Sequence, residues 1–354
     1  MAENKRIEWV DIARGIAIIL VVLGHSPVGR DLFNYLYSFH VPLFFFVAGI
    51  TFRFDKESDF SSFVKKRFLR LLVPYYTFGM IAIAAFYLAN KLGVGALDMF
   101  GYSPTLLQMF KSLLYGSGEN HALYFYQALW FLPCMFSVCL ISYGICKSAL
   151  CFKEKNRNAV ILCCAGLFVI LTFAIRVFCS SLSLPLGLVQ SFVHIPFFLL
   201  AVVLRSSELL CTNKRLSNAL LAFILIFTGA FVSIGHNFCV AQFKLITIHA
   251  ILIAYAVGVV SCLGYIKLCM AVHHSRVVSF VGQWTLPILV LHKYPIALGD
   301  ILFPQFRHNS ENLYYCIPMT IFAVVISLLV GMLIDRYLPF LYGKPCRKQK
   351  KRVG

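Results

Sequence analysis

Stretches of about twenty apolar residues recur along the whole chain, and they limit its fold more than any other feature. The 354 residues are 60% hydrophobic and 13% charged, whereas soluble proteins carry roughly 25% charged residues. We therefore predict an all-α integral membrane protein built as a bundle of about ten transmembrane helices. The expected spans are residues 11–28, 33–53, 71–90, 122–146, 159–178, 187–204, 218–236, 245–266, 277–298 and 315–338.

We interpret the net charge of +18 as a sign of membrane topology. We do not expect a nucleic-acid partner. The basic residues alternate with the apolar spans, and one orientation of the bundle places 24 of the 32 lysines and arginines in cytoplasmic segments. Because positive residues are retained on the cytoplasmic side, this orientation predicts that both termini are cytoplasmic. Seven of the others lie outside, and Arg14 lies at the edge of the first span.

The connections between spans are too short for a soluble domain. The longest outer connection runs from about 91 to 121, and the longest inner one from about 54 to 70. We predict one transmembrane domain over residues 1–343 and a basic cytoplasmic tail over 344–354, whose cations face lipid head groups. Any chemistry must therefore take place inside the bundle or at its two faces.

Arg14 and His25 are ionisable residues within the first span, where such groups are costly and usually functional. Eleven residues at 100° each come within about 20° of three full turns, so both lie on one helix face, about 16 Å apart. That face links the membrane edge to a buried imidazole. In the alternative interpretation, Arg14 only reaches the interface and pairs with Asp11, and His25 is a hydrogen-bonded core histidine.

Polar residues separate by predicted depth, with arginines near the cytoplasmic face and histidines in the outer halves of spans. Guanidinium groups suit phosphates, and neutral imidazoles suit proton transfer, which favours a phosphorylated donor entering from the cytoplasm toward a deeper base. We expect no metal site, because the spans lack closely spaced ligand pairs. The inner group is Asp11, Arg14, Arg67, Arg70 and Arg276, and the outer group is His25, His40, His194, His236, His249 and His292.

Taken singly, several of these residues have ordinary structural explanations. The cluster from Lys65 to Arg70 is typical of the inner flank of a span. For His194, His236 and His249, a structural role is favoured over a catalytic one. Phe44, Phe45 and Phe46 are ordinary packing residues unless Gly49 approaches a ligand.

Five segments occur in a fixed order along nearly the whole chain. They are Trp9–Gly15 continuing to His25, Phe39–Gly49, Lys66–Tyr75, Ala128–Pro133 and Gly282–His292. In this order they resemble the membrane-bound acyltransferase 3 family, in which an arginine or lysine precedes a histidine by eleven positions. Ala48 stands where serine is commoner in that family. His40 and the Leu129–Pro133 string are most similar to its fucose O-acetylase-like branch.

The resemblance implies transfer of an acetyl group from acetyl-CoA to a hydroxyl of a cell-envelope glycan or small molecule, in the bacterial cytoplasmic membrane. Arg14, Arg67 and Arg70 would hold the CoA phosphates, and His25 would act as general base. His40 or His292 would orient the acceptor hydroxyl or donate a hydrogen bond to the thioester oxyanion. A variant has His25 accept the acetyl group covalently.

Two other classes of function remain open at this point. Intramembrane histidines and arginines also serve proton-coupled exporters of glycans or small molecules, and a non-catalytic scaffold is the third class. The acceptor is expected to meet polar residues at the outer mouth. These are Glu119, Asn120, His121, Tyr124, Gln127, Arg176, Asp300 and Arg307.

Overall fold

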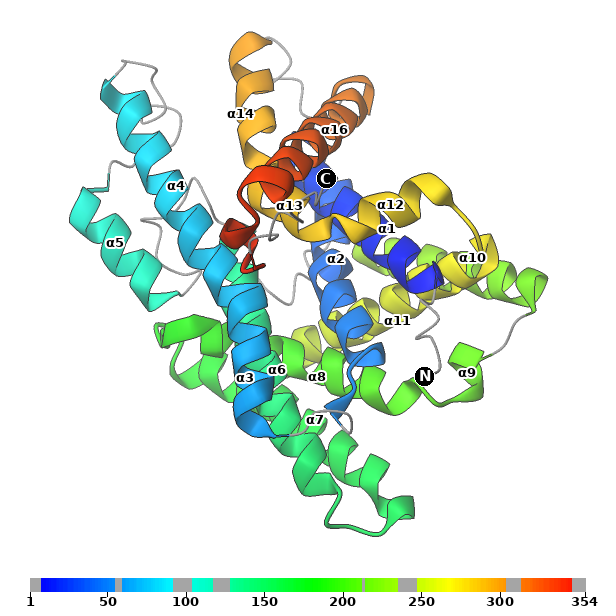
Figure 1. The fold of residues 1–354 in the computed structure, drawn as a ribbon. Helices are drawn as coiled ribbons and strands as arrows, with labels where there is room; N and C mark the ends of the chain where they lie inside the picture. The colour runs from blue at the N-terminus through cyan, green and yellow to red at the C-terminus, as the bar shows by residue number, and fades with distance from the viewer. Residues whose placement is uncertain are drawn as a thin grey trace, which may run out of the picture.

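The computed structural model describes residues 8–54, 59–91, 104–116, 128–211, 214–234, 247–303 and 313–345, and in these ranges every regular element is a helix (Figure 1). Eight of the described helices are long and apolar enough to cross a membrane, or nine if a bent pair forms one span. Helix α1 (Glu8–His25) is not among them because it carries three charged residues, Glu8, Asp11 and Arg14. The all-α membrane fold is confirmed, and the orientation of the termini stays a prediction.

The helices follow the expected spans in order. After α1 come α2 (Arg30–Ile50), α3 (Phe60–Arg67), η2 (Phe68–Leu72), α4 (Val73–Lys91), α5 (Leu106–Tyr115), α6 (Phe131–Ala149), α7 (Glu154–Phe178), η4 (Pro185–Gly187), α8 (Leu188–Leu204), α9 (Glu208–Cys211), α10 (Arg215–Ser233), α11 (Ile248–Val272), α12 (Arg276–Gln283), α13 (Thr285–Leu291), α14 (Lys293–Leu302), α16 (Leu313–Tyr337) and η5 (Pro339–Tyr342). Helix α5 occupies part of the outer connection expected over 91–121.

The span expected over 277–298 is broken into α12, α13 and α14 instead of forming one helix. Pro287 and Pro295 lack the N–H that would bond the carbonyls four residues earlier, at Gln283 and Leu291, and their rings crowd those carbonyls. Helices α13 and α14 consequently meet at an angle of 44°. His292 lies at this bend, between the two helices.

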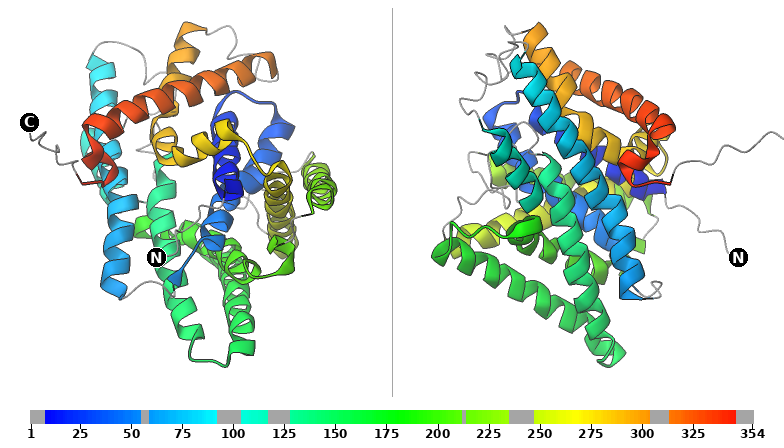
Figure 2. Two further views of the ribbon diagram at one scale, coloured as in Figure 1. Left: turned by 45° about the vertical axis from the view of Figure 1, so that its right-hand side comes forward. Right: turned by 60° about the vertical axis from the view of Figure 1, so that its left-hand side comes forward.

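Helices α1 and α2 lie at the centre of the bundle, as Figures 1 and 2 show. Helix α1 packs against α2, α11 and α12, and α2 packs against α8 and α11. The apolar window of α10 is only 22% buried inside the bundle, whereas that of the span containing α8 is 72% buried. The apolar face of α10 therefore faces lipid, and α8 belongs to the interior.

Glycines allow the closest helix contacts around α1 and α2. A Cβ on Gly282 would overlap the carbonyl oxygen of Asp11, and a Cβ on Gly15 would overlap that of Val278. These two glycines bring α12 directly onto the backbone of α1. Gly49 similarly contacts the backbone of Phe198 on α8, so this close approach serves helix packing.

Candidate functional site

A cavity of about 470 Å³ brings together the three arginines expected to bind phosphate. Arg14 reaches it from α1, Arg67 from the end of α3 and Arg70 from η2. Thr51, directly after α2, and Thr285, the first residue of α13, also line it. Arg276 is exposed at the start of α12 and is not part of this lining.

Arg14 both pairs with Asp11 and lines the cavity, so the two interpretations of its sequence position hold together. Its Nη1 lies 3.6 Å from Oδ1 of Asp11, and its Nη2 donates to Oγ1 of Thr51 over 3.5 Å. Asp11 is only 2% exposed, so the ion pair places a carboxylate just inside the protein. The pair with Asp11 therefore holds the guanidinium at the cavity wall rather than excluding it from the cavity.

Arg67 and Arg70 are positioned by the junction between α3 and α4. The Arg67 guanidinium lies 5.1 Å from the centre of the Phe63 ring, within the range of a cation–π contact. Arg70 lies in the π-helical turn η2. Pro74 has no N–H for the Arg70 carbonyl, and the wider turn, in which the Val73 N–H donates to the Phe68 carbonyl, accommodates it. This turn leaves Arg70 exposed at the cavity.

The three histidines expected to be catalytic form one cluster. His25 is the last residue of α1, and its ring lies 5.2 Å from that of His292 in a stacked arrangement. Tyr37 on α2 donates a hydrogen bond to the Gly24 carbonyl over 3.2 Å, and its oxygen lies 3.4 Å from Nδ1 of His25. The Tyr37 ring also meets the ring of His40 edge-on at 4.7 Å. Tyr37 thus joins His25 and His40.

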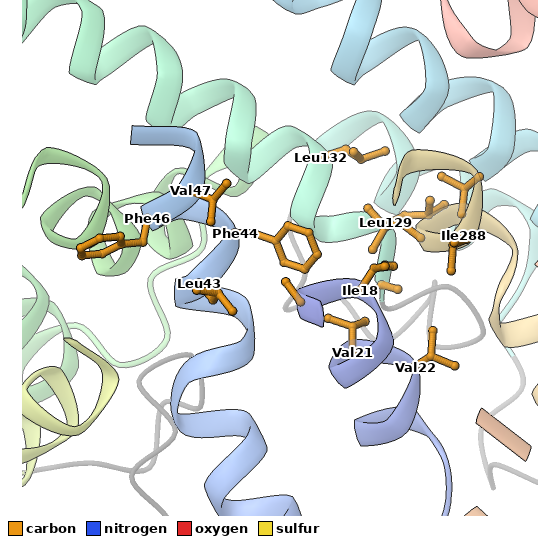
Figure 3. Packing of buried hydrophobic residues seen from close by; sticks show 14 of the residues in the cluster. Ile18, Val21, Val22, Leu43, Phe44, Phe46, Val47, Leu129, Leu132 and Ile288 are labelled. Atoms are coloured by element: carbon orange, nitrogen blue, oxygen red, sulfur yellow. The ribbon is translucent and has the colours of Figure 1, made fainter. Parts of the chain in front are cut away.

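A layer of buried apolar side chains from α1, α2, α13 and the start of α6 packs around the stretch of α1 between Arg14 and His25 (Figure 3). Along α1, Arg14 is followed by Ile18, Val21, Val22 and then His25, and the same order of polar, apolar and histidine recurs in two other helices. Along α2 the order runs backward from Thr51 to His40, also over eleven residues, and along α13 it runs from Thr285 to His292. The layer consists of Ile18, Val21, Val22, Leu43, Phe44, Val47, Leu129, Leu132 and Ile288.

The other polar residues singled out in the sequence are more scattered. His194 is fully buried on α8, where its ring stacks 4.3 Å from that of Phe45 and 5.9 Å from that of Trp130. His249 is exposed in the first turn of α11. Arg176 is buried in the last turn of α7, and Asp300 accepts a hydrogen bond from Tyr315. Outside the described residues lie Glu119, Asn120, His121, Tyr124, Gln127, His236 and Arg307.

Sequence reasoning missed two residues of the site. Tyr37 precedes His40 by three positions and so shares its helix face, a spacing that could have indicated it. Thr51 follows His40 by eleven positions, the same spacing that drew attention to α1.

The arginine cavity offers positive charge, and the histidine cluster offers groups that can accept a proton. Three guanidinium groups around one cavity suit a ligand with several phosphates. Three clustered imidazoles suit transfer of a proton. Within the described ranges, no three histidine, cysteine, aspartate or glutamate side chains gather as ligands for a metal ion.

The family model of an acyltransferase domain, Acyl_transf_3, matches residues 7–334. The match covers the arginine cavity, the apolar layer and the histidine cluster. No curated protein and no solved structure matches the chain. Since the matched region spans nearly the whole sequence, the chain belongs to the acyltransferase 3 family and is a multi-pass membrane acyltransferase.

Proposed function

We propose that the protein transfers an acetyl group from cytoplasmic acetyl-CoA to a hydroxyl of a cell-envelope glycan or related small molecule, in the bacterial cytoplasmic membrane. One observation carries the proposal: a cavity lined by Arg14, Arg67 and Arg70 lies toward one end of α1 and a cluster of three histidines lies at its other end, with an apolar layer between Arg14 and His25. The first feature suits a phosphorylated donor and the second suits a hydroxyl acceptor.

The donor's nucleotide part would occupy the arginine cavity. Coenzyme A carries a pyrophosphate and a 3′-phosphate, and guanidinium groups bind such anions by charge-assisted hydrogen bonds. Its narrow, uncharged pantetheine arm can then extend along α1 toward His25. The separation of Arg14 and His25, about 16 Å along the helix, matches an arm of this kind.

His25 would act as general base once the thioester reaches the cluster. Its imidazole takes the proton of the acceptor hydroxyl, while the hydroxyl oxygen forms a bond to the acetyl carbonyl carbon. The carbon–sulfur bond then breaks, and the CoA thiolate leaves and takes up the proton from His25. A positioned general base typically accelerates such a step by about 10² to 10⁴-fold.

The test uses the full chain in lipid nanodiscs, supplied with ¹⁴C-acetyl-CoA and an envelope glycan extract from the cells that make it. The wild type should release free CoA and label a glycan, whereas His25→Ala should lose at least 99% of this activity and still be stabilised by CoA against heat. His249→Ala, which changes an exposed histidine on α11, is the matched control and should remain active. Transfer by His25→Ala at the wild-type rate would contradict the proposed base.

The same assay separates the competing functions. An exporter would move glycan without releasing CoA from acetyl-CoA, and a scaffold would show no thermal stabilisation by CoA. Labelled acetyl trapped on the protein when the extract is omitted would identify the covalent route through His25. Mass spectrometry of the labelled product then names the acceptor.

A further inference from the structure

The segment that follows α16, residues 338–344, is held against α4. Thr77 on α4 donates a hydrogen bond to the Leu341 carbonyl over 2.8 Å, and the ring of Phe78 stacks on that of Tyr342 at 5.2 Å. Tyr342 is only 2% exposed. Figure 1 shows η5, the short helix of this segment, beside α4. The segment therefore packs as part of the bundle.

Gly343 brings this segment to the rim of the arginine cavity. Its φ of 66° lies in the left-handed region, and a Cβ at this position would overlap the carbonyl oxygen of Leu69 in η2. Glycine alone adopts this conformation readily and permits such a close approach. Leu69 is followed by Arg70 and Leu71, which both line the cavity. The backbone of Gly343 thus lies directly beside one wall of the cavity.

Lys344 comes next and extends its ammonium group toward a second wall. Its Nζ lies 5.9 Å from the centre of the Trp284 ring, within the range of a cation–π contact. Trp284 directly precedes Thr285, the first residue of α13, which lines the cavity. Lys344 therefore lies between the two elements that place Arg70 and Thr285 at the cavity.

The ammonium of Lys344 keeps donors for a ligand. One N–H is donated to Oδ1 of Asp335 over 2.6 Å, and an ammonium carries three such donors. The Lys344 side chain is 55% exposed, whereas that of Asp335 is 14% exposed. The ion pair therefore holds the ammonium at the rim and leaves part of it open to a ligand that arrives from solvent.

The position of Lys344 indicates which group of the proposed donor it meets. In coenzyme A the pantetheine arm is attached to the pyrophosphate, and the 3′-phosphate lies on the ribose beyond it, farther from the thioester. With the arm along α1, the pyrophosphate lies near Arg14 and the 3′-phosphate lies toward the mouth of the cavity. Arg70 and Lys344 are exposed cations at that mouth. A phosphate monoester carries about two negative charges at neutral pH, and lysine binds phosphate as a point charge.

We propose that Lys344 binds the 3′-phosphate of coenzyme A as a fourth cationic residue of the donor site, an inference that rests on the proposed acetyl transfer. Its ammonium donates to the phosphate oxygens, while the pair with Asp335 keeps it at the rim. The site thereby binds coenzyme A more tightly than 3′-dephospho-coenzyme A. From the sequence, Lys344 was assigned to a basic tail that faces lipid head groups, so the test separates these two sources of phosphate.

The test measures the Kd of the full chain for coenzyme A and for 3′-dephospho-coenzyme A by calorimetry, in nanodiscs of phosphatidylcholine, which lack anionic lipid. Lys344→Gln should raise the Kd for coenzyme A about tenfold, because a hydrogen bond between charged groups is lost. Its Kd for 3′-dephospho-coenzyme A should stay within twofold of the wild type. Lys344→Arg should stay within threefold for both ligands. Lys153→Gln, which changes an exposed lysine directly before α7, is the matched control and should bind both as the wild type does.

Asp335→Asn distinguishes a ligand contact from a structural role of the ion pair. This variant breaks the pair but keeps the ammonium, so it should bind coenzyme A within threefold of the wild type or more tightly. If Asp335→Asn weakens binding as much as Lys344→Gln does, the pair only supports the fold and the proposal is overturned. An equal rise of both Kd values in Lys344→Gln would overturn it as well.

The lipid alternative and the proposed function have outcomes of their own. An effect of Lys344→Gln that appears only after phosphatidylserine is added to the nanodiscs would assign Lys344 to lipid and overturn the proposal. If the wild type binds both ligands as expected but consumes no acetyl-CoA with envelope extract, the acetyl transfer fails and the 3′-phosphate contact stands. A wild type that binds neither ligand would overturn both.

Discussion

Replacing Arg14 by glutamine should lower both the stability of the fold and the affinity for acetyl-CoA, because Arg14 contacts Asp11 and lines the cavity. Breaking a buried ion pair typically costs about 3–5 kcal/mol. The Arg14 side chain, however, is 37% exposed, so water screens much of this interaction. We therefore expect a loss of only about 1–2 kcal/mol in the free energy of unfolding.

The effect on donor binding is a separate quantity. A hydrogen bond that involves a charged group contributes about 1.5–3 kcal/mol, which corresponds to roughly a 10 to 150-fold increase in Kd. Arg70→Gln should produce only this second effect, since Arg70 is exposed in η2. Comparing the two variants therefore separates the effect on the free energy of unfolding from the effect on donor binding.

The assay is a set of four proteins: wild type, Arg14→Gln, Asp11→Asn and the double variant. Unfolding is followed by heat in detergent, and Kd by titration with ¹⁴C-acetyl-CoA. The double variant should regain most of the stability lost in Arg14→Gln, since the buried carboxylate is gone, yet bind the donor as weakly as Arg14→Gln. Recovery of affinity in the double variant, or unchanged Kd in Arg14→Gln, would refute the assigned role in binding.

Two further predictions concern packing and the histidine cluster. Gly282→Ala should lower the melting temperature, because its Cβ would overlap the Asp11 carbonyl. Gly166→Ala is the control and should leave the melting temperature unchanged, because its Cβ would meet nothing within 4 Å. Equal melting temperatures of the two variants would contradict this packing. Tyr37→Phe should lower kcat for CoA release about tenfold, because one hydrogen bond of about 1.4 kcal/mol no longer orients the His25 ring. Tyr87→Phe, on an exposed face of α4, is its control, and equal kcat values would argue against that role.

Much of the fold could be predicted from the sequence, because the bilayer imposes one length on every span. Hydropathy gives the length of an apolar segment but not the direction of its helix axis. The late span was therefore expected as one helix, although Pro287 and Pro295 break it. The third span was expected to begin at residue 71. Its helix begins at Phe60, because the basic residues before 71 are helical without being apolar.

Part of the candidate site could also be predicted from the sequence. Arg14 and His25 share one helix, so their spacing alone predicted a common face. The contact between the rings of His25 and His292 joins residues 267 positions apart, and periodicity within a helix carries no information about such a pairing.

The apolar layer between the cavity and the histidines also has a consequence for the cell. Ile18, Leu132 and Ile288 are at most 1% exposed, and such a constriction excludes water and ions. A water-filled path between the arginine cavity and the buried histidines would let protons leak through the membrane. We expect this packing to prevent such a leak, and the pantetheine arm of the proposed donor would have to part these side chains to reach His25.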